Sequence, residues 1–134
     1  MSSPSPPLRT VIIEDNPALL TLLSGMLDGI PGVQVVGNAA SEDHAIDMLR
    51  TQRPHLAIVD LELRGGTGLK VLAAIQGAPV DFGSPRTVVF SNHAHPVVQS
   101  RCLALGAEAF FDKSFQMDEL LEFVQNFAHH SSGN

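Results

Sequence analysis

Short apolar runs alternate with longer amphipathic segments along most of this 134-residue chain. The apolar runs, rich in Val, Ile and Ala, lie at residues 10–13, 34–37, 56–60, 87–90 and 109–112. Most of them are continuous rather than alternating, which is typical of strands that are covered on both faces. The pattern predicts five parallel strands joined by helical crossovers.

Apolar residues recur at helical spacing in the segments that follow each predicted strand. Boundary signals agree with this spacing: Asn16 and Pro17 suit a cap and a first helical position, Ser41 precedes two acids, and Gly106 follows the fourth helical segment. The last helix shows the pattern most clearly, through Met117, Leu120, Leu121, Val124 and Ala128. We therefore predict an α/β domain of five βα units, a doubly wound sheet.

One domain accounts for the length of the chain, because single cores typically span about 50 to 250 residues. Residues 1–8 are mostly Ser and Pro, so we expect a flexible lead-in there, followed by the domain at 9–128 and a short polar tail at 129–134. The start at Met1 and the short polar end favour a stand-alone domain.

The charge balance is acidic, with 8 Lys and Arg against 14 Asp and Glu and a formal net charge of −6. Such a field repels phosphate backbones, so we expect no direct nucleic-acid binding. The single cysteine excludes an internal disulfide, and the amino terminus lacks the charged and apolar regions of a signal peptide. No apolar run approaches the roughly 20 residues that span a bilayer. We predict a cytoplasmic protein without membrane insertion.

Polar residues follow four of the five predicted strands. Glu14 and Asp15 follow the first, Asp60 closes the third, Ser91 follows the fourth and Lys113 follows the fifth. The carboxyl ends of parallel strands meet at one edge of a sheet, which is where such sheets bind ligands. If the first strand is central, strands one and three are neighbours and three carboxylates converge. Their repulsion then requires a proton or a cation, and a hard divalent ion is the natural occupant.

The chain resembles the response-regulator receiver family over residues 9–127. Four motifs carry the resemblance in order and spacing: Val-Ile-Ile before Glu14 and Asp15, Ala-Ile-Val before Asp60, Val-Val-Phe before Ser91, and Gly-Ala-Glu-Ala-Phe-Phe-Asp before Lys113. The resemblance implies a (βα)5 flavodoxin-like receiver fold with strand order 2-1-3-4-5.

The same resemblance implies the roles of the residues at the strand ends. Asp60 would be the phosphoacceptor, and Mg²⁺ would be held by Glu14, Asp15, Asp60 and the backbone carbonyl of Glu62. Lys113 would contact the phosphoryl oxygens. These roles agree with the chemistry of a carboxylate nucleophile, which forms an acyl phosphate when cations neutralise charge on the transferring group.

A switch is also implied by the resemblance. Ser91 would contact the phosphoryl group and move toward it, and Phe110 would turn inward with it. The switch would change the face made by the fourth helix, fifth strand and fifth helix, where a downstream protein binds. We therefore expect a phosphoacceptor of a two-component or phosphorelay system, served by a histidine kinase or phosphotransfer protein, and not an enzyme with a separate substrate.

Three positions depart from the usual family pattern. Phe110 replaces the common tyrosine, which removes a hydroxyl from the switch. Ser114 follows Lys113 where the family usually has proline, and a cis bond to serine costs about 2.5 to 4 kcal/mol, so we predict a trans bond. Arg64 replaces a frequent proline four residues after Asp60, and the glycine-rich loop at residues 64–68 is expected to be mobile.

Three other functions agree with parts of this pattern. Asp60 and Glu62 faintly resemble the paired acids of phosphatases that pass through an aspartyl phosphate, but the second Asp and a cap domain are missing. An interaction module that is not phosphorylated would not need the acidic triad and Lys113. A flavin protein of similar topology is disfavoured, because no phosphate-cradling loop follows the first strand and the chain has no Trp or Tyr.

Overall fold

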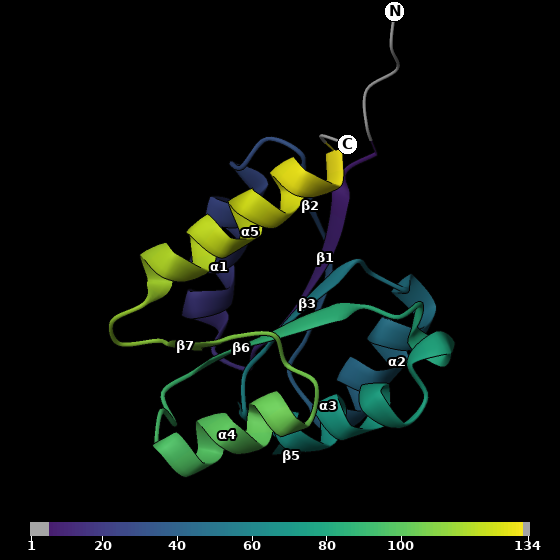
Figure 1. Cartoon of the computed structure of the whole chain (residues 1–134), viewed down its shortest axis with the longest axis vertical. Coiled ribbons are helices and arrows are strands. Elements are labelled where there is room, and N and C mark those ends of the chain that lie inside the picture. The colour runs from purple at the N-terminus through teal and green to yellow at the C-terminus, as the bar shows by residue number, and fades with distance from the viewer. Residues whose placement is uncertain (1–5, 133–134) are drawn as a thin grey trace, which may run out of the picture.

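A five-stranded parallel sheet forms the centre of the computed structural model, which describes residues 6–132 (Figure 1). Its strands are β1 Leu8–Ile13, β2 Val33–Ala39, β3 Leu56–Val59, β6 Arg86–Ser91 and β7 Phe110–Asp112. They are ordered β2-β1-β3-β6-β7, and every neighbouring pair is parallel. The predicted strand order 2-1-3-4-5 and the doubly wound α/β class are confirmed.

Helices cover both faces of this sheet. They are α1 Pro17–Asp28, α2 Glu42–Gln52, α3 Gly68–Gly77, α4 Pro96–Ala104 and α5 Met117–Ser132, with a 3₁₀ turn η1 at Pro79–Phe82. Figure 1 shows α1 and α5 together on one side and α2, α3 and α4 on the other. The chain therefore has three layers, with the sheet between two layers of helices (Figure 1).

The core is split into two apolar clusters by the sheet itself. Val11 and Ile13 of β1 pack in the cluster that α2, α3 and α4 cover, whereas Leu8 and Ile12 pack in the cluster under α1 and α5. Successive side chains of a strand point to opposite faces, so a strand covered on both faces needs apolar residues throughout. This is why the strands read as continuous apolar runs.

The predicted helix starts are confirmed at α1 and α2. The side chain of Asn16 accepts hydrogen bonds from the amides of Ala18 and Leu19, at 3.0 and 3.2 Å, and Pro17 is the first helical residue. Ser41 caps α2 in the same way. These side chains satisfy amides that have no partner within the helix.

Both ends of the domain differ from the boundaries that composition suggested. Leu8 already belongs to β1, because its side chain is buried and its amide donates to the carbonyl of Gly32 at 2.7 Å. At the other end α5 continues to Ser132, through most of the predicted tail, and no Pro or Gly interrupts it. Residues 1–5 of the predicted lead-in and 133–134 of the tail lie outside the described residues.

A small hairpin directly after the third strand of the sheet was not predicted. Its strands are β4 Glu62–Leu63 and β5 Gly66–Thr67, which pair antiparallel. Gly65, in the turn between them, has a φ of +73°, which favours glycine. The glycine-rich segment expected as a mobile loop is thus built as a turn with paired strands.

Candidate functional site

The five polar residues singled out in the sequence lie at the carboxyl edge of the sheet. Glu14 and Asp15 follow β1, Asp60 follows β3, Ser91 ends β6 and Lys113 follows β7. Backbone hydrogen bonds tie these ends to one another, since the amide of Asp60 donates to Ile13 at 2.9 Å and that of Lys113 donates to Ser91 at 3.1 Å. The sheet therefore fixes the positions of these side chains.

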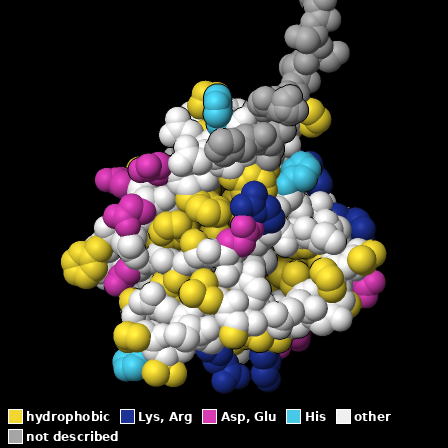
Figure 2. Space-filling model, viewed as in Figure 1, with side chains coloured by type: hydrophobic (Ala, Val, Ile, Leu, Met, Phe, Trp, Pro, Cys, Tyr) yellow, Lys and Arg dark blue, Asp and Glu magenta, His cyan; other side chains and the backbone are white. Residues whose placement is uncertain are grey.

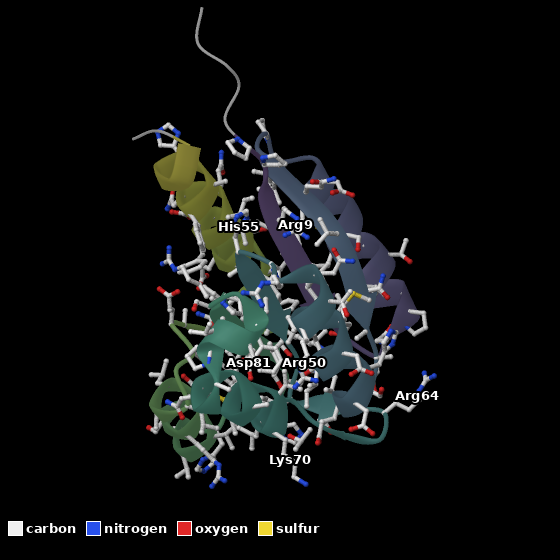
Figure 3. All side chains as sticks on the ribbon, turned by 90° about the vertical axis from the view of Figure 1, so that its right-hand side faces the viewer. Arg9, Arg50, His55, Arg64, Lys70 and Asp81 are labelled. Carbon is white, nitrogen blue, oxygen red and sulfur yellow. The ribbon has the colours of Figure 1, made fainter. Side chains whose placement is uncertain are left out.

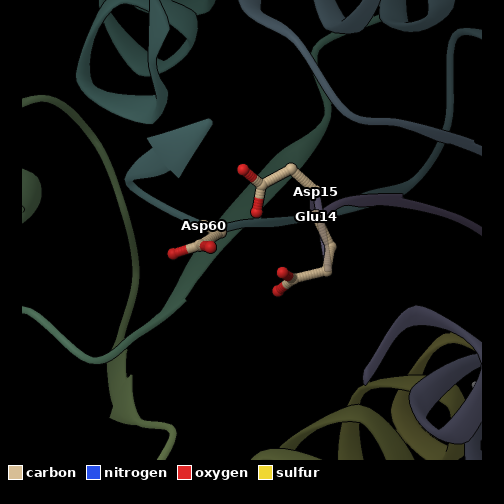
Figure 4. Close-up of side chains that lie close together, drawn as sticks. All are labelled: Glu14, Asp15 and Asp60. Carbon is tan, nitrogen blue, oxygen red and sulfur yellow. The ribbon is translucent and has the colours of Figure 1, made fainter. Parts of the chain in front are cut away.

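Three carboxylates converge at this edge, as the strand order requires. Glu14, Asp15 and Asp60 each offer one oxygen, and these oxygens all lie within 4.8 Å of one another (Figure 4). Glu14 and Asp60 are buried, with 3% and 4% of their surfaces exposed, and Asp15 is half-buried. The trio is an all-oxygen donor set of the kind that Mg²⁺ and Ca²⁺ prefer.

Lys113 neutralises part of this charge. Its Nζ lies 2.7 Å from Oε1 of Glu14 and 2.8 Å from Oδ2 of Asp60, and only 12% of its side chain is exposed. Desolvation acts to lower the pKa of Lys113, but the hydrogen bonds and charges of Asp60 and Glu14 outweigh it and raise the pKa above its ordinary value. The ammonium group is thus held charged between two buried carboxylates.

The pKa of Glu14 is raised above its ordinary value, and burial is the main cause. Hydrogen bonds from Lys113 and from the amide of Asn16, the latter at 3.0 Å, act in the opposite direction, while the neighbouring charge of Asp60 raises the pKa further. A desolvated carboxylate next to a like charge is poorly stabilised. A cation bound by the three carboxylates would reduce the electrostatic repulsion between them.

Gly68 and the amide of Glu62 shape the surroundings of Asp60. The Glu62 amide donates to Oδ1 of Asp60 at 3.4 Å. A Cβ atom on Gly68 would lie 2.1 Å from the backbone oxygen of Asp60, so no side chain fits at that position. The first turn of α3 therefore packs directly against the backbone of the residue that carries the central carboxylate.

Ser91 and Phe110, the predicted switch pair, belong to the neighbouring parallel strands β6 and β7. Ser91 is fully buried, and its hydroxyl accepts a hydrogen bond from the amide of His93 at 3.1 Å. Phe110 is half-buried and packs against the cluster that α2, α3 and α4 cover. The movement predicted for these two residues stays a prediction.

Two contacts at the site could not be found by sequence reasoning. Nε2 of His93 lies 3.0 Å from Oε2 of Glu62, and both side chains are more than half exposed. Glu62 belongs to β4 and His93 to the loop between β6 and α4, and no periodic pattern reports such a pair. The predicted trans bond between Lys113 and Ser114 is confirmed, and the Ser114 amide donates to Oδ1 of Asp112 at 2.8 Å.

Comparison with known proteins agrees with this geometry. The family described as response regulator receiver domain matches residues 10–125. The nitrate/nitrite response regulator protein NarL of Escherichia coli strain K12 is 30% identical over 124 residues, which are 91% of this chain and 55% of NarL. The chain thus spans about half the length of the curated relatives it matches.

Solved structures match over nearly the whole chain. The signal receiver domain of the putative response regulator NarL from Mycobacterium tuberculosis superposes with a TM-score of 0.82 at 25% identity, covering 92% of this chain and 98% of that one. A CheY-like receiver domain protein from Methanospirillum hungatei JF-1 gives 0.77 at 21% identity, covering 95% and 97%. The latter likeness concerns the fold alone.

Receiver domains of this family bind Mg²⁺ at an acidic pocket and interact with histidine kinases and downstream effectors. Some relatives, such as the protein-glutamate methylesterase of Treponema pallidum, are enzymes, and the chain covers 27% of that protein. Among the described residues, no helix is both long and apolar enough to cross a membrane. The family match, the strand order and the converged acids together show that this chain belongs to the response regulator receiver domain family.

Proposed function

We propose that Asp60 accepts a phosphoryl group from a phosphohistidine of a histidine kinase or phosphotransfer protein. The observation that carries this proposal is the position of Asp60, whose carboxylate lies beside two further carboxylates and is 2.8 Å from the Lys113 ammonium. A carboxylate oxygen of Asp60 attacks phosphorus, an O–P bond forms and the N–P bond of the donor breaks. The leaving imidazole nitrogen takes up a proton.

The residues around Asp60 have different roles in this transfer. Glu14, Asp15, Asp60 and the backbone carbonyl of Glu62 would hold Mg²⁺, which when bound would neutralise charge on the transferring group. Lys113 has three N–H donors and uses two of them on Glu14 and Asp60. It can therefore reach a phosphoryl oxygen without leaving the site.

Substitution of Asp60 tests this assignment. The wild-type chain, incubated with acetyl phosphate and Mg²⁺, should gain the mass of one phosphoryl group, and hydroxylamine should remove it. Asp60→Asn should gain none, whereas the matched control Asp118→Asn, an exposed acid on α5, should behave as wild type. A phosphoryl group retained by Asp60→Asn would refute the assignment. Turnover of a small phosphate ester would instead favour the phosphatase alternative.

The proposal includes a signalling face on α4, β7 and α5. Two apolar residues of α4, Val97 and Leu103, are 69% and 50% exposed, and Phe110 of β7 is half-buried. Acidic side chains gather at the amino end of α5 (Figure 2). A downstream protein would bind this mixed surface after Ser91 donates its hydroxyl to the phosphoryl group and Phe110 turns inward.

Spectroscopy can test the switch separately from the chemistry. Beryllofluoride with Mg²⁺ imitates an aspartyl phosphate, so amide resonances of residues 91–115 should shift in the wild-type protein. Unchanged spectra would contradict the switch and leave the phosphoacceptor assignment standing. The cytoplasmic location belongs to the same proposal, since the donor proteins act on the cytoplasmic side of signalling systems.

A further inference from the structure

Arg64 lies in the turn of the β4–β5 hairpin, four residues after Asp60. Its amide donates to the carbonyl of Ala40 at 3.1 Å, which joins the turn to the loop after β2. Figure 3 shows the Arg64 side chain extending outward from the body of the domain. The side chain is exposed, so its guanidinium group is accessible to a molecule that approaches from solution.

Glu42, at the start of α2, holds this hairpin in place. Its Oε1 accepts a hydrogen bond from the amide of Thr67 at 3.2 Å. A Cβ atom on Gly66 would lie 2.4 Å from Cβ of Glu42, so the two elements pack in close contact. The hairpin is therefore attached to α2 on one side and continuous with the strand of Asp60 on the other, and the position of Arg64 follows from the fold.

The guanidinium group of Arg64 lies at the edge of the acidic pocket. Its Nη2 is 3.5 Å from the backbone oxygen of Asp15, at the long end of hydrogen-bond distances. No ion pair in the described part of the chain involves Arg64, so its charge is not neutralised by a carboxylate. Lys113, by contrast, is already engaged by Glu14 and Asp60.

The acidic pocket repels an anionic donor, and a cation at the edge of the pocket would reduce this repulsion. Its three carboxylates outnumber its one ammonium, so without Mg²⁺ the group has a net negative charge that repels an anionic phosphodonor on approach. A planar guanidinium with two N–H groups facing outward binds phosphoryl oxygens in a bidentate way.

We infer that Arg64 binds a phosphoryl oxygen of the incoming donor and so raises the rate of phosphotransfer to Asp60. The inference rests on the proposed phosphoacceptor function. The ligand is a phosphoryl group activated for transfer, and it can come from a phosphohistidine or from a small acyl phosphate. Arg64 forms and breaks no covalent bond itself; it positions the donor and offsets its charge.

The test measures phosphorylation of Asp60 at low donor concentration, with Mg²⁺ at saturation, in two arms. One arm uses acetyl phosphate and the other uses phosphoimidazole, a small analogue of phosphohistidine. Arg64→Gln should lower the rate about fivefold, the upper end of the effect expected for one exposed charged contact. Arg64→Lys should lie between wild type and Arg64→Gln. The matched control is Lys70→Gln, an exposed cation on α3, which should stay within about twofold of wild type.

Magnesium affinity separates a donor contact from a general change in the site. Removing a cation beside Asp15 should leave Mg²⁺ affinity unchanged or tighter in Arg64→Gln, measured by thermal shift against Mg²⁺ concentration. If Arg64→Gln weakened Mg²⁺ binding, the residue would be supporting the hairpin and the inference would be overturned. Loss of rate with only one donor would support the inference and identify the source of the phosphoryl group.

The two proposals fail in different ways in this experiment. If wild type showed no phosphorylation with either donor, the phosphoacceptor function itself would be refuted. If wild type were phosphorylated on Asp60 and Arg64→Gln matched its rate with both donors, only the role of Arg64 would be refuted. Equal losses in Arg64→Gln and Lys70→Gln would also overturn it, because net charge alone would then explain the effect.

Discussion

Replacing Lys113 with methionine should destabilise the metal-free protein because it leaves two buried carboxylates without their cation. The ammonium group lies 2.7 Å from Glu14 and 2.8 Å from Asp60, and those two side chains are 2% and 5% exposed. Methionine keeps most of the unbranched stem of lysine, so packing along the side chain is largely preserved. The substitution therefore removes charge and hydrogen bonds with little change in volume.

The size of the effect follows from burial. Removing one partner of a buried ion pair costs about 3 to 5 kcal/mol, because the remaining charge is left desolvated. The side chain of Lys113 is 12% exposed, and water can reach part of the site, so the lower end of that range, about 3 kcal/mol, is expected. Lys70→Met, at an exposed position on α3, should change the free energy of unfolding by no more than about 0.5 kcal/mol.

Urea unfolding in EDTA measures the loss of stability, and urea unfolding with Mg²⁺ measures how much of it the ion restores. Lys113→Met should lose stability in EDTA and should gain more from Mg²⁺ than wild type does, because the ion offsets the charge that lysine no longer balances. A variant within about 1 kcal/mol of wild type in EDTA would contradict the buried-pair argument. Equal Mg²⁺ stabilisation of both proteins would contradict the electrostatic coupling between Lys113 and the acidic trio.

The pH dependence of the same variant has a definite sign. Burial raises the pKa of Glu14 above its ordinary value of 4.5, and the hydrogen bond from Lys113 is the largest effect that lowers it. Without Lys113 the pKa of Glu14 should rise further. A carboxyl group with a raised pKa favours folding below the unfolded pKa, and that contribution is lost as pH rises through the folded pKa. The destabilisation of Lys113→Met should therefore be small in acid and grow above pH 4.5.

Three further substitutions test other parts of the site. Asp15→Asn should lose Mg²⁺ affinity and raise the apo melting temperature, since it reduces the repulsion within the trio; a wild-type response to Mg²⁺ would count against the metal site. Gly68→Ala should cost about 1 to 3 kcal/mol and slow phosphorylation of Asp60, whereas Gly77→Ala, with open space around its Cβ position, should be at least as stable as wild type. Ser91→Ala should remain a phosphoacceptor but lose the amide shifts of residues 91–115, and their persistence would show that the switch does not depend on the hydroxyl.

The fold and the convergence of the acids could be predicted because both depend on regular, repeated features. Strands covered on two faces must be apolar throughout, so their ends are visible wherever a polar residue follows. Since parallel strands share their carboxyl edge, Glu14, Asp15, Asp60 and Lys113 could be placed together from chain order alone. Strand order decides whether the first and third strands are neighbours, and the neighbouring positions of β1 and β3 bring Asp60 beside Glu14.

The hairpin after Asp60 and its attachment to α2 could not be predicted in the same way. Strands of two residues show no periodicity, and glycines at positions 65 and 66 suggested flexibility. Their close contact with Glu42 depends on a side chain that is more than twenty residues away in the chain. Ser114 is a similar case, because its amide donates to Asp112, a bond that a proline could not make. Long-range side-chain contacts of this kind leave no pattern in a single sequence.

The oxygens of Asp60 are already engaged before any phosphoryl group arrives, and the two contacts differ in strength. Oδ2 accepts from Lys113 at 2.8 Å, whereas Oδ1 accepts from the Glu62 amide at 3.4 Å, a longer and weaker bond. Breaking the hydrogen bond to Oδ1 therefore costs less free energy than breaking the one to Oδ2. Lys113 can transfer one hydrogen bond to the incoming group and keep its bond to Glu14, so its charge stays inside the pocket throughout. The cation that stabilises the resting fold is thus already placed to stabilise the phosphorylated state, and Lys113→Met should weaken both.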